Sequence, residues 1–167
     1  MPGPEPSREA RRSAGFAAFT VGAAGRLLHT ATLLTAEPPD ANPAARRLLR
    51  LALARTYADW HRLRDDDPYD HARRCLADRF ATGLWLRHGV PLRARPPAHG
   101  PLAALPPRQR LILVLRLYEG VPADQTAALL GLPLDRVHTL CERAVTAVLH
   151  PEPAPVPRGA RPRAATP

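Results

Sequence analysis

Residues 102–149 constrain the fold of this chain more than any other segment. They predict a helix, a break, a short helix, a tight turn and a final helix, which is the order of a helix-turn-helix. Ala127 is small where the two helices must cross closely, Gly131 can adopt the positive φ that ends the first helix, and Val137 can fill the angle between them. We therefore expect an all-α fold that ends in a helix-turn-helix.

The charge of the chain is strongly positive but unevenly distributed. All 24 basic residues are arginine, and the formal net charge is +9, which favours polyanionic partners. Residues 101–150, however, contain five arginines and four acidic residues. The helix-turn-helix segment is thus nearly neutral, so bulk charge gives it little attraction for DNA.

No pattern typical of catalysis or metal binding occurs in the sequence. The seven histidines lack the HExxH spacing and other ligand spacings, and neither GxSxG nor a glycine-rich phosphate loop is present. Cys75 and Cys141 lie far apart without a CxxC partner, which indicates small apolar residues rather than a disulfide or a zinc site. The acidic run 65–67 is typical of a solvated turn and helix cap. We predict a non-enzymatic protein with no catalytic residue, metal or cofactor.

The hydropathy pattern argues against a membrane protein. No apolar run reaches the roughly eighteen residues that a membrane-spanning helix needs. Arg11 and Arg12 precede a stretch of small apolar residues, a faint likeness to a twin-arginine export signal, but Arg26 and His29 interrupt that stretch. We predict a cytoplasmic location and no membrane partner.

The pattern of proline, glycine and charge divides the chain into five segments. Residues 1–12 and 151–167 are rich in proline and charge and are expected to be disordered tails. A first helical domain is expected over residues 13–88 and a second over 102–150, with a flexible Pro/Gly-rich linker over 89–101.

Helical periodicity sets the inner and outer faces of the first domain. Helices are predicted over 13–35, 44–63 and 69–88, of which the second is the most clearly amphipathic. Its phase directs Arg47 and Leu51 outward. The residues expected to face inward are Phe16, Phe19, Leu27 and Leu34 in the first helix, Leu49, Ala52, Leu53, Thr56, Tyr57 and Trp60 in the second, and Leu76, Phe80 and Leu84 in the third.

Four segments, followed by the helix-turn-helix, resemble the extracytoplasmic-function sigma factors of bacteria, most closely the short two-domain type of high-GC genomes. They are ATLLTAEPP (31–39), ALARTYADWHRLR (52–64), DPYDHARR (67–74) and LPPRQRLILVLRLYEGVP (105–122). The resemblance implies that residues 13–88 are a region 2 domain, which grips the polymerase clamp and melts the −10 promoter element. It implies that residues 102–150 are a region 4 domain, which reads the −35 element with its last helix. The implied partners are RNA polymerase core, promoter DNA and an anti-sigma factor.

The second helix departs from the family pattern on its outer face. Arg46, Arg47 and Leu51 stand at the family's acidic positions, and Arg50 stands at its glutamine. The resemblance implies that this surface meets basic groups on the polymerase, where like charges can cost several kcal/mol, as an order of magnitude. We predict Arg46, Arg47, Arg50 and Leu51 as a polymerase- or partner-binding surface. Two other interpretations stay open: a solvated face that has lost its partner, and a face with a different partner.

The last helix has an outer face of mixed charge. Its inner stripe is predicted to be Leu134, Val137, Cys141, Ala144, Val145 and Val148, and its outer face Asp135, Arg136, Thr139, Glu142, Arg143 and Thr146, with His138 at the edge. The predicted DNA-binding residues are Arg136, His138, Thr139 and Arg143. Asp135 and Glu142 oppose the attraction to phosphate, so a packing or protein-contact role for this helix stays open.

Two functions follow from these patterns. The first is a sigma-factor-like transcription regulator, which binds promoter DNA and RNA polymerase core to direct initiation. The alternative is a diverged sigma-like interaction module, which binds an anti-sigma factor or another regulator without initiating transcription. Arg46, Arg47 and Leu51 favour the alternative more than the fold alone does.

Overall fold

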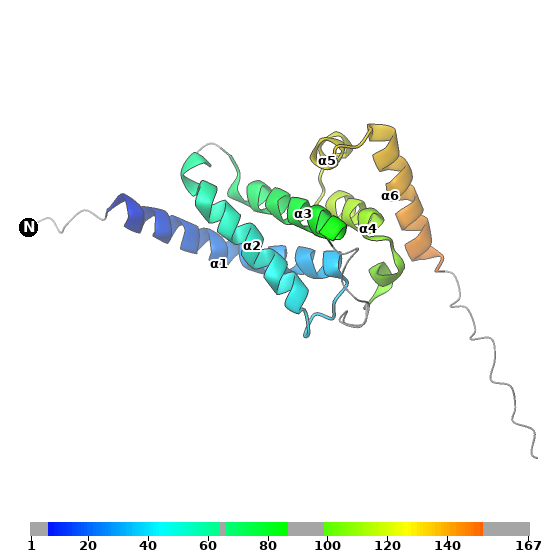
Figure 1. The fold of residues 1–167 in the computed structure, drawn as a ribbon, viewed down its shortest axis with the longest axis horizontal. Coiled ribbons are helices and arrows are strands. Elements are labelled where there is room, and N and C mark those ends of the chain that lie inside the picture. Colours follow the sequence, from blue (N-terminus) through cyan, green and yellow to red (C-terminus); the bar gives the residue numbers. More distant parts are fainter. Residues whose placement is uncertain (1–6, 64–65, 87–98, 152–167) are drawn as a thin grey trace, which may run out of the picture.

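The computed structural model describes residues 7–63, 66–86 and 99–151, with only the backbone of 84–86, and this part of the chain is helical without strands (Figure 1). The predicted all-α class is confirmed. The longer helices are α1 (Arg8–Thr35), α2 (Pro43–Asp59), α3 (Pro68–Leu86), α4 (Pro107–Leu113), α5 (Ala123–Leu130) and α6 (Leu134–Leu149). Three short helical turns accompany them: η1 (Trp60–Arg62), η4 (Pro101–Ala104) and η5 (Val114–Tyr118).

The first helix begins at Arg8, earlier than the predicted residue 13. The Ser7 hydroxyl accepts a hydrogen bond from the backbone N–H of Ala10 (3.2 Å), which caps the first turn. Arg12 donates to the carbonyl of Tyr57 and lies 4.5 Å from the centre of the Tyr57 ring. These contacts extend the helix into a segment that composition alone marks as disordered.

A buried glutamate joins α1 to α2. The Glu37 carboxylate accepts hydrogen bonds from the backbone N–H groups of Ala44 (3.0 Å) and Ala45 (2.8 Å) in the first turn of α2. Helix N-termini leave such N–H groups without intrahelical partners and favour negative charge. Glu37 therefore fixes the angle at which α2 returns along α1, although Asn42 occupies the cap position.

Helices α1, α2 and α3 form a three-helix unit around the apolar residues that periodicity assigns to its interior. Leu27, Leu34, Ala52, Thr56 and Leu76 are fully buried, Leu49 and Phe80 nearly so, and Phe16, Phe19, Leu53, Tyr57 and Trp60 half-buried. The predicted inward position of Leu84 concerns a side chain outside the described residues. The same holds for most of the predicted linker (87–98) and for the predicted tails at 1–6 and 152–167.

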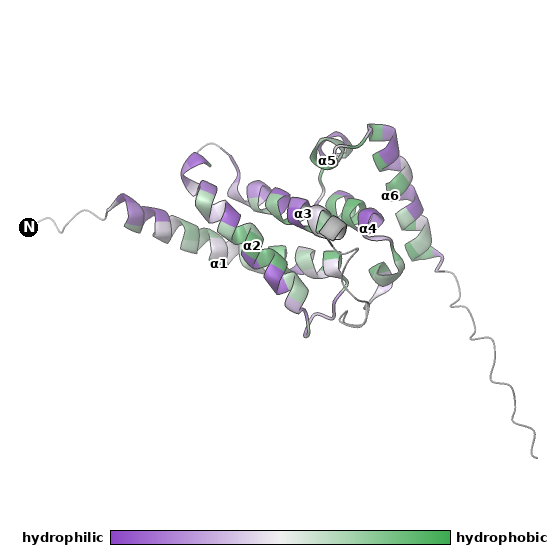
Figure 2. Ribbon diagram, in the orientation of Figure 1, coloured by the Kyte–Doolittle hydropathy of each residue, from purple (hydrophilic) through white to green (hydrophobic). Residues whose placement is uncertain are grey.

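The helix-turn-helix unit comprises η4 to α6 and has the predicted geometry. Gly131 ends α5 with φ +60°, and the N–H of Leu132 bonds to the carbonyl of Ala127 (3.0 Å), which closes the turn. Ala127 and Val137 are buried beside Ile112 of α4. Figure 2 shows α6 banded in green and purple, as expected for a helix with one apolar and one polar face.

One predicted inner position of α6 is wrong. Leu134 is 48% exposed, and Leu140, which the prediction omitted, is buried together with Val137 and Ala144. Helical side chains lean toward the N-terminus, so a residue in the first position of α6 leans off the end of the helix instead of over a neighbouring turn.

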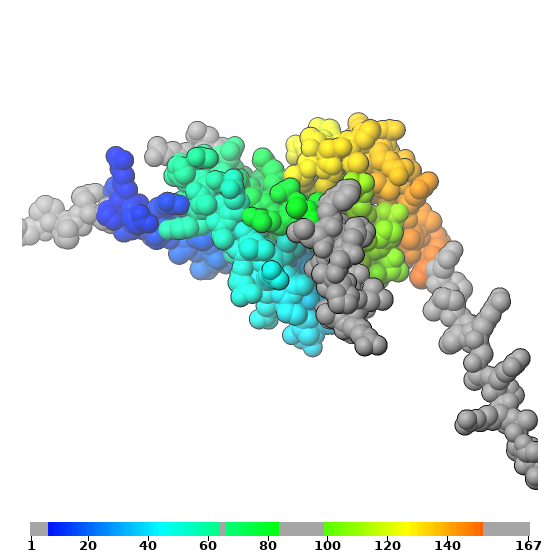
Figure 3. All heavy atoms as spheres, in the orientation of Figure 1, coloured from blue at the N-terminus to red at the C-terminus, as the bar shows by residue number. Residues whose placement is uncertain are grey.

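The two units share one hydrophobic core. Leu111, Val114, Leu115 and Val121 pack in the same buried cluster as the residues of α1, α2 and α3. Figure 3 shows the yellow and orange atoms of α5 and α6 in one continuous body with the green atoms of α3 and α4. The helix-turn-helix unit therefore docks on the three-helix unit, whereas the sequence predicts two domains on a flexible tether.

Replacing Leu76 with alanine tests this core. Leu76 is fully buried on α3, so Leu76→Ala should lower the free energy of unfolding by about 2–5 kcal/mol. Leu149, 68% exposed at the end of α6, is the matched control, and Leu149→Ala should change it by less than about 0.5 kcal/mol. Urea unfolding followed by circular dichroism measures both, and equal losses would contradict the assignment of the core.

Candidate nucleic-acid interface

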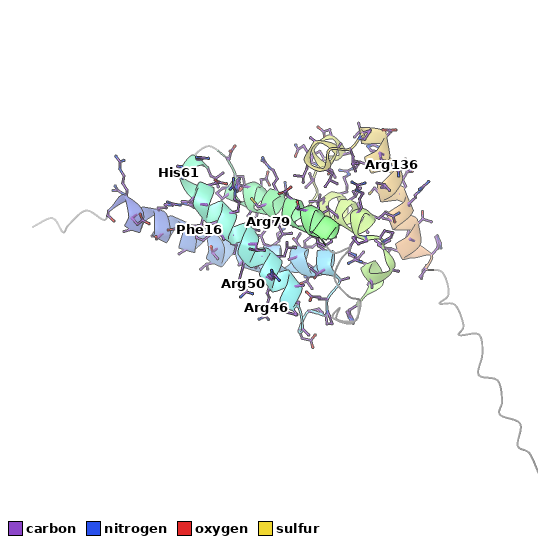
Figure 4. The ribbon with its side chains drawn as sticks, viewed as in Figure 1. Phe16, Arg46, Arg50, His61, Arg79 and Arg136 are labelled. Carbon is purple, nitrogen blue, oxygen red and sulfur yellow. The ribbon has the colours of Figure 1, made fainter. Side chains whose placement is uncertain are left out.

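The outer face of α6 presents the residues predicted to contact DNA. Arg136, His138 and Arg143 are exposed and form no hydrogen bond or ion pair with another described residue. Figure 4 labels Arg136 near the start of α6. Two guanidinium groups and an imidazole are thus available to phosphates or base edges.

Thr139 is less exposed than the other three predicted DNA-binding residues. It is half-buried, and its hydroxyl donates to the carbonyl of Asp135 one turn earlier (2.9 Å). Because this bond uses the hydroxyl proton, Thr139 offers a lone pair to an incoming donor, such as a base amino group. The side chains of Asp135 and Glu142 are also exposed, so the face has equal numbers of arginines and carboxylates.

The outer face of α2 presents the second predicted surface. Arg46, Arg47 and Arg50 are exposed, and Leu51 is 42% exposed among them. The Nε of Arg46 donates to the Asn42 side chain (2.9 Å), whereas Arg47 and Arg50 have no partner among the described residues. Figure 4 shows Arg46 and Arg50 on α2, well apart from Arg136 on α6. The structure therefore keeps the two predicted surfaces separate.

An open, basic pocket lies where α2, α3 and α5 meet. Its volume is about 450 Å³, and its walls combine three arginines with one carboxylate. The lining residues are Arg55, Arg74, Cys75, Asp78, Arg79, Thr82 and Leu129. Leu129 comes from α5, so the pocket lies on the interface between the two units.

A buried carboxylate occupies the centre of that interface. The Glu119 side chain is fully buried, and its oxygens lie 3.4 Å from Arg26 and 3.9 Å from Arg73. The Tyr69 hydroxyl lies 3.0 Å from both oxygens, and the Thr30 hydroxyl donates to one of them. A charge removed from water needs such partners, because a buried carboxylate without them is strongly destabilising. We name Glu119 with Arg26, Thr30, Tyr69 and Arg73 the Glu119 cluster.

The Glu119 cluster alters the ionisation of Tyr69. Burial raises the pKa of the Tyr69 phenol well above its ordinary value, and the neighbouring Glu119 charge raises it further. The phenol therefore stays protonated at neutral pH and donates its hydrogen bond to the carboxylate. Arg26, at 5.1 Å from the centre of the Tyr69 ring, completes this side of the cluster.

A buried arginine makes the second polar contact between the units. Arg110, in the LPPRQR segment, donates to the carbonyls of Leu34 (3.0 Å) and Leu105 (2.9 Å). Leu34 lies in the last turn of α1, where carbonyl groups lack intrahelical partners and favour positive charge. Arg110 thus fastens α4 to the end of α1.

Sequence reasoning did not identify Glu119 or Arg110. Arg110 stands two residues after Arg108 and Glu119 three residues after Arg116, so their neighbours in the sequence do not mark either of them as buried. The turn η5 is π-helical, with a bond from the Glu119 N–H to the Val114 carbonyl (3.0 Å), and Gly120 follows it with φ +69°. Such a wider turn shifts the phase of the residues after it, so regular periodicity misplaces Glu119.

Cys75 and Cys141 pack against the apolar clusters, as expected of small apolar residues. Both are free and half-buried, and burial raises the pKa of each thiol. The described residues contain no group of histidines, cysteines and carboxylates arranged to hold a metal ion. None of the helices in the described ranges has the length and apolarity needed to cross a bilayer.

Comparisons with the sequences of known proteins agree with the helix-turn-helix assignment. Residues 102–148 match the family model of sigma-70 region 4, so the helix-turn-helix unit is a domain of the sigma-70 class. The RNA polymerase sigma-E factor of Streptomyces coelicolor is 31% identical over 137 residues, which cover 71% of this chain and 75% of that protein. The sigma-E factor of Streptomyces antibioticus is 30% identical, with 71% and 74% covered. No solved structure gave a significant match.

The chain belongs to the extracytoplasmic-function sigma factor family. Its role is sigma-factor-like, in transcription initiation, and this is favoured over the alternative of an interaction module without initiation.

The raised pKa of Tyr69 predicts a pH dependence. In the unfolded chain tyrosine ionises near pH 10, so the stability gained by burying the neutral phenol is present below about pH 10 and lost as the pH rises toward the raised value. The free energy of unfolding of the native protein should therefore fall more steeply above pH 10 than that of Tyr69→Phe. Urea unfolding at pH 8, 10 and 11 measures both, and parallel curves would contradict the burial of this phenol.

Proposed function

We propose that this protein binds RNA polymerase core and promoter DNA as a non-enzymatic initiation factor. The observation that supports this most is the exposed, unpartnered set Arg136, His138 and Arg143 on the last helix of an intact helix-turn-helix. In this proposal α6 enters the major groove of the −35 element, and the three-helix unit serves the polymerase and the −10 element. The protein acts where DNA and polymerase are, in the cytoplasm.

The absence of net charge on the outer face of α6 determines which contacts with DNA this helix can make in the proposal. Arg136 and Arg143 can pair with guanine or phosphate, and Asp135 or Glu142 can accept from cytosine. Since two carboxylates offset two arginines, α6 gains little from the counterion release that supplies non-specific affinity. Binding by this helix should therefore depend on base contacts and on delivery to DNA by the polymerase.

The proposed contact with polymerase is the outer face of α2. Leu51 at its centre offers an apolar anchor, and Arg46, Arg47 and Arg50 offer guanidinium groups to an acidic surface of the polymerase, which would differ from the basic surface that the family resemblance implies. A basic rim around an exposed leucine fits an acidic partner surface better than a basic one. An anti-sigma factor that competes with polymerase would use the same face.

Substitution of Arg143 tests the DNA-binding face. In a complex of the full chain with polymerase core, Arg143→Ala should weaken promoter binding by about 1–3 kcal/mol if Arg143 reads a base, or roughly five- to 150-fold. Fluorescence anisotropy with a labelled promoter fragment, over a salt series, measures this loss. Arg62→Ala is the matched control, because Arg62 is an exposed arginine on η1, outside the proposed face. Unchanged promoter binding by Arg143→Ala would remove it from the interface.

Substitution of Leu51 tests the polymerase contact. A carboxylate at the centre of the α2 face would be desolvated next to an acidic partner, so Leu51→Asp should reduce capture of polymerase core at least tenfold. Val21→Asp, at a site 89% exposed on α1, controls for the added charge. Surface-immobilised core and purified variants give the affinities. Equal capture of both variants would place the polymerase contact elsewhere.

A further inference from the structure

We propose that the basic pocket where α2, α3 and α5 meet binds a small molecule through a phosphate monoester group. The pocket is lined by Arg55, Arg74, Cys75, Asp78, Arg79, Thr82 and Leu129. None of these residues belongs to the faces proposed above for DNA and polymerase, which are the outer faces of α6 and α2. The site is therefore additional to the proposed function and does not rest on it.

The pocket has the size of a site for a small organic molecule. Its volume is about 450 Å³, and ligand pockets in proteins commonly measure roughly 300–1,000 Å³. Its lining residues come from three helices, so they surround a hollow instead of following one helix. A single phosphate group is too small to fill that volume, which leaves room for an organic group beside it.

Two arginines of α3 supply cations that have no partner. Arg74 and Arg79 are exposed and form no hydrogen bond or ion pair with another described residue. Figure 4 shows Arg79 on α3, apart from Arg46 and Arg50 on α2. A guanidinium group binds two phosphate oxygens through parallel hydrogen bonds, which suits arginine to phosphate recognition. Both groups are thus available to an anion in the pocket.

A carboxylate behind the lining holds the third arginine in place. The Nε of Arg55 lies 2.8 Å from the Asp59 carboxylate, whose side chain is largely buried. The Nε2 of His71 lies 3.5 Å from the same oxygen of Asp59 and 3.4 Å from the sulfur of Cys75. These contacts connect the α2 wall of the pocket to its α3 wall. Because Arg55 is already oriented, a ligand loses less free energy in ordering it.

The charges of the lining favour a dianion over a strand of nucleic acid. Three arginines and Asp78 give the lining a formal charge of +2. A phosphate monoester carries about 1.5 to 2 negative charges at neutral pH, whereas each phosphodiester of a nucleic acid carries one. Asp78 repels the successive phosphates of a strand, but it can accept a hydrogen bond from a hydroxyl or amino group of a small ligand.

The uncharged residues of the lining suit the organic part of such a ligand. Leu129 and Cys75 offer apolar surface, and Thr82 offers a hydroxyl. Burial raises the pKa of the Cys75 thiol, so the thiol stays protonated at neutral pH and adds no negative charge beside the phosphate. The charged residues all lie on α2 and α3, so the phosphate site belongs to the three-helix unit.

Alkylation of Cys75 measures occupancy of the pocket. In a Cys141→Ser variant of the full chain, Cys75 is the one remaining cysteine, and its rate of reaction with iodoacetamide at pH 8 reports access to the pocket. Inorganic phosphate is the probe, with ionic strength held constant by sodium chloride. It should slow the reaction at least about threefold and with saturation, as expected for binding at one site. Alkylation of Cys141 in a Cys75→Ser variant is the control and should not respond to phosphate.

Two further probes at the same phosphate concentration test the class of ligand. Dimethyl phosphate, a diester with one negative charge, should give less than about a third of the protection. A single-stranded DNA of twelve nucleotides should give none, because Asp78 disfavours a strand in the pocket.

Substitutions in the Cys141→Ser background test the residues. The half-saturating concentration of phosphate does not depend on the intrinsic reactivity of the thiol. Arg79→Gln should raise it at least about tenfold, because a hydrogen-bonded charge is lost. Arg62→Gln, at an exposed arginine on η1 outside the pocket, removes the same charge and should change it less than about twofold. Asp78→Asn should lower it roughly fivefold, because a like charge next to the phosphate is removed.

Each possible failure identifies a different error. Absence of saturable protection by inorganic phosphate would overturn the site. An unchanged half-saturating concentration in Arg79→Gln would place the bound anion elsewhere. Equal protection by dimethyl phosphate would overturn the preference for a monoester, and protection by DNA alone would assign the arginines to nucleic acid. These outcomes do not depend on promoter or polymerase binding, which the Arg143 and Leu51 variants test separately.

Discussion

The arrangement of this protein depends on the burial of one carboxylate. Glu119 has no exposed side-chain surface, and a charge in that position is tolerated only beside cations and hydrogen-bond donors. Arg26, Arg73, Tyr69 and Thr30 supply them from two helices that are distant in sequence. The apolar contacts of Leu111, Val114 and Leu115 draw the units together, and they would allow many orientations. The Glu119 cluster selects one, because only one places all four partners around the carboxylate.

The helix-turn-helix could be predicted from the sequence because its determinants are local. Gly131, Ala127 and Val137 lie within eleven residues of one another, and each acts on the turn that contains it. The exposed faces of α2 and α6 followed from helical phase for the same reason. The sequence placed Leu134 on the inner face of α6, but helical periodicity does not account for the end of a helix, where the side chain has no neighbouring turn to cover.

The docking of the two units could not be predicted in the same way. Arg110 and Arg26 look like ordinary surface arginines in a chain with 24 of them, and only the fold shows which arginine meets a buried acceptor. The π-helical turn before Gly120 adds a residue to the turn, so a regular period assigns Glu119 no particular face. The role of Glu37 could not be predicted from the sequence either, because its carboxylate caps α2 only when α2 returns along α1.

The distribution of charge suggests how the two units divide the work of a sigma factor. The α6 face is neutral, and the arginine excess lies in the first 100 residues, of which Arg46, Arg47, Arg50, Arg74 and Arg79 are exposed on α2 and α3. Phosphate contacts supply affinity without sequence information, whereas base contacts supply sequence information. A neutral outer face on α6 gains little non-specific affinity from phosphate, so in the proposed function the arginine excess of the three-helix unit supplies affinity and α6 supplies sequence discrimination.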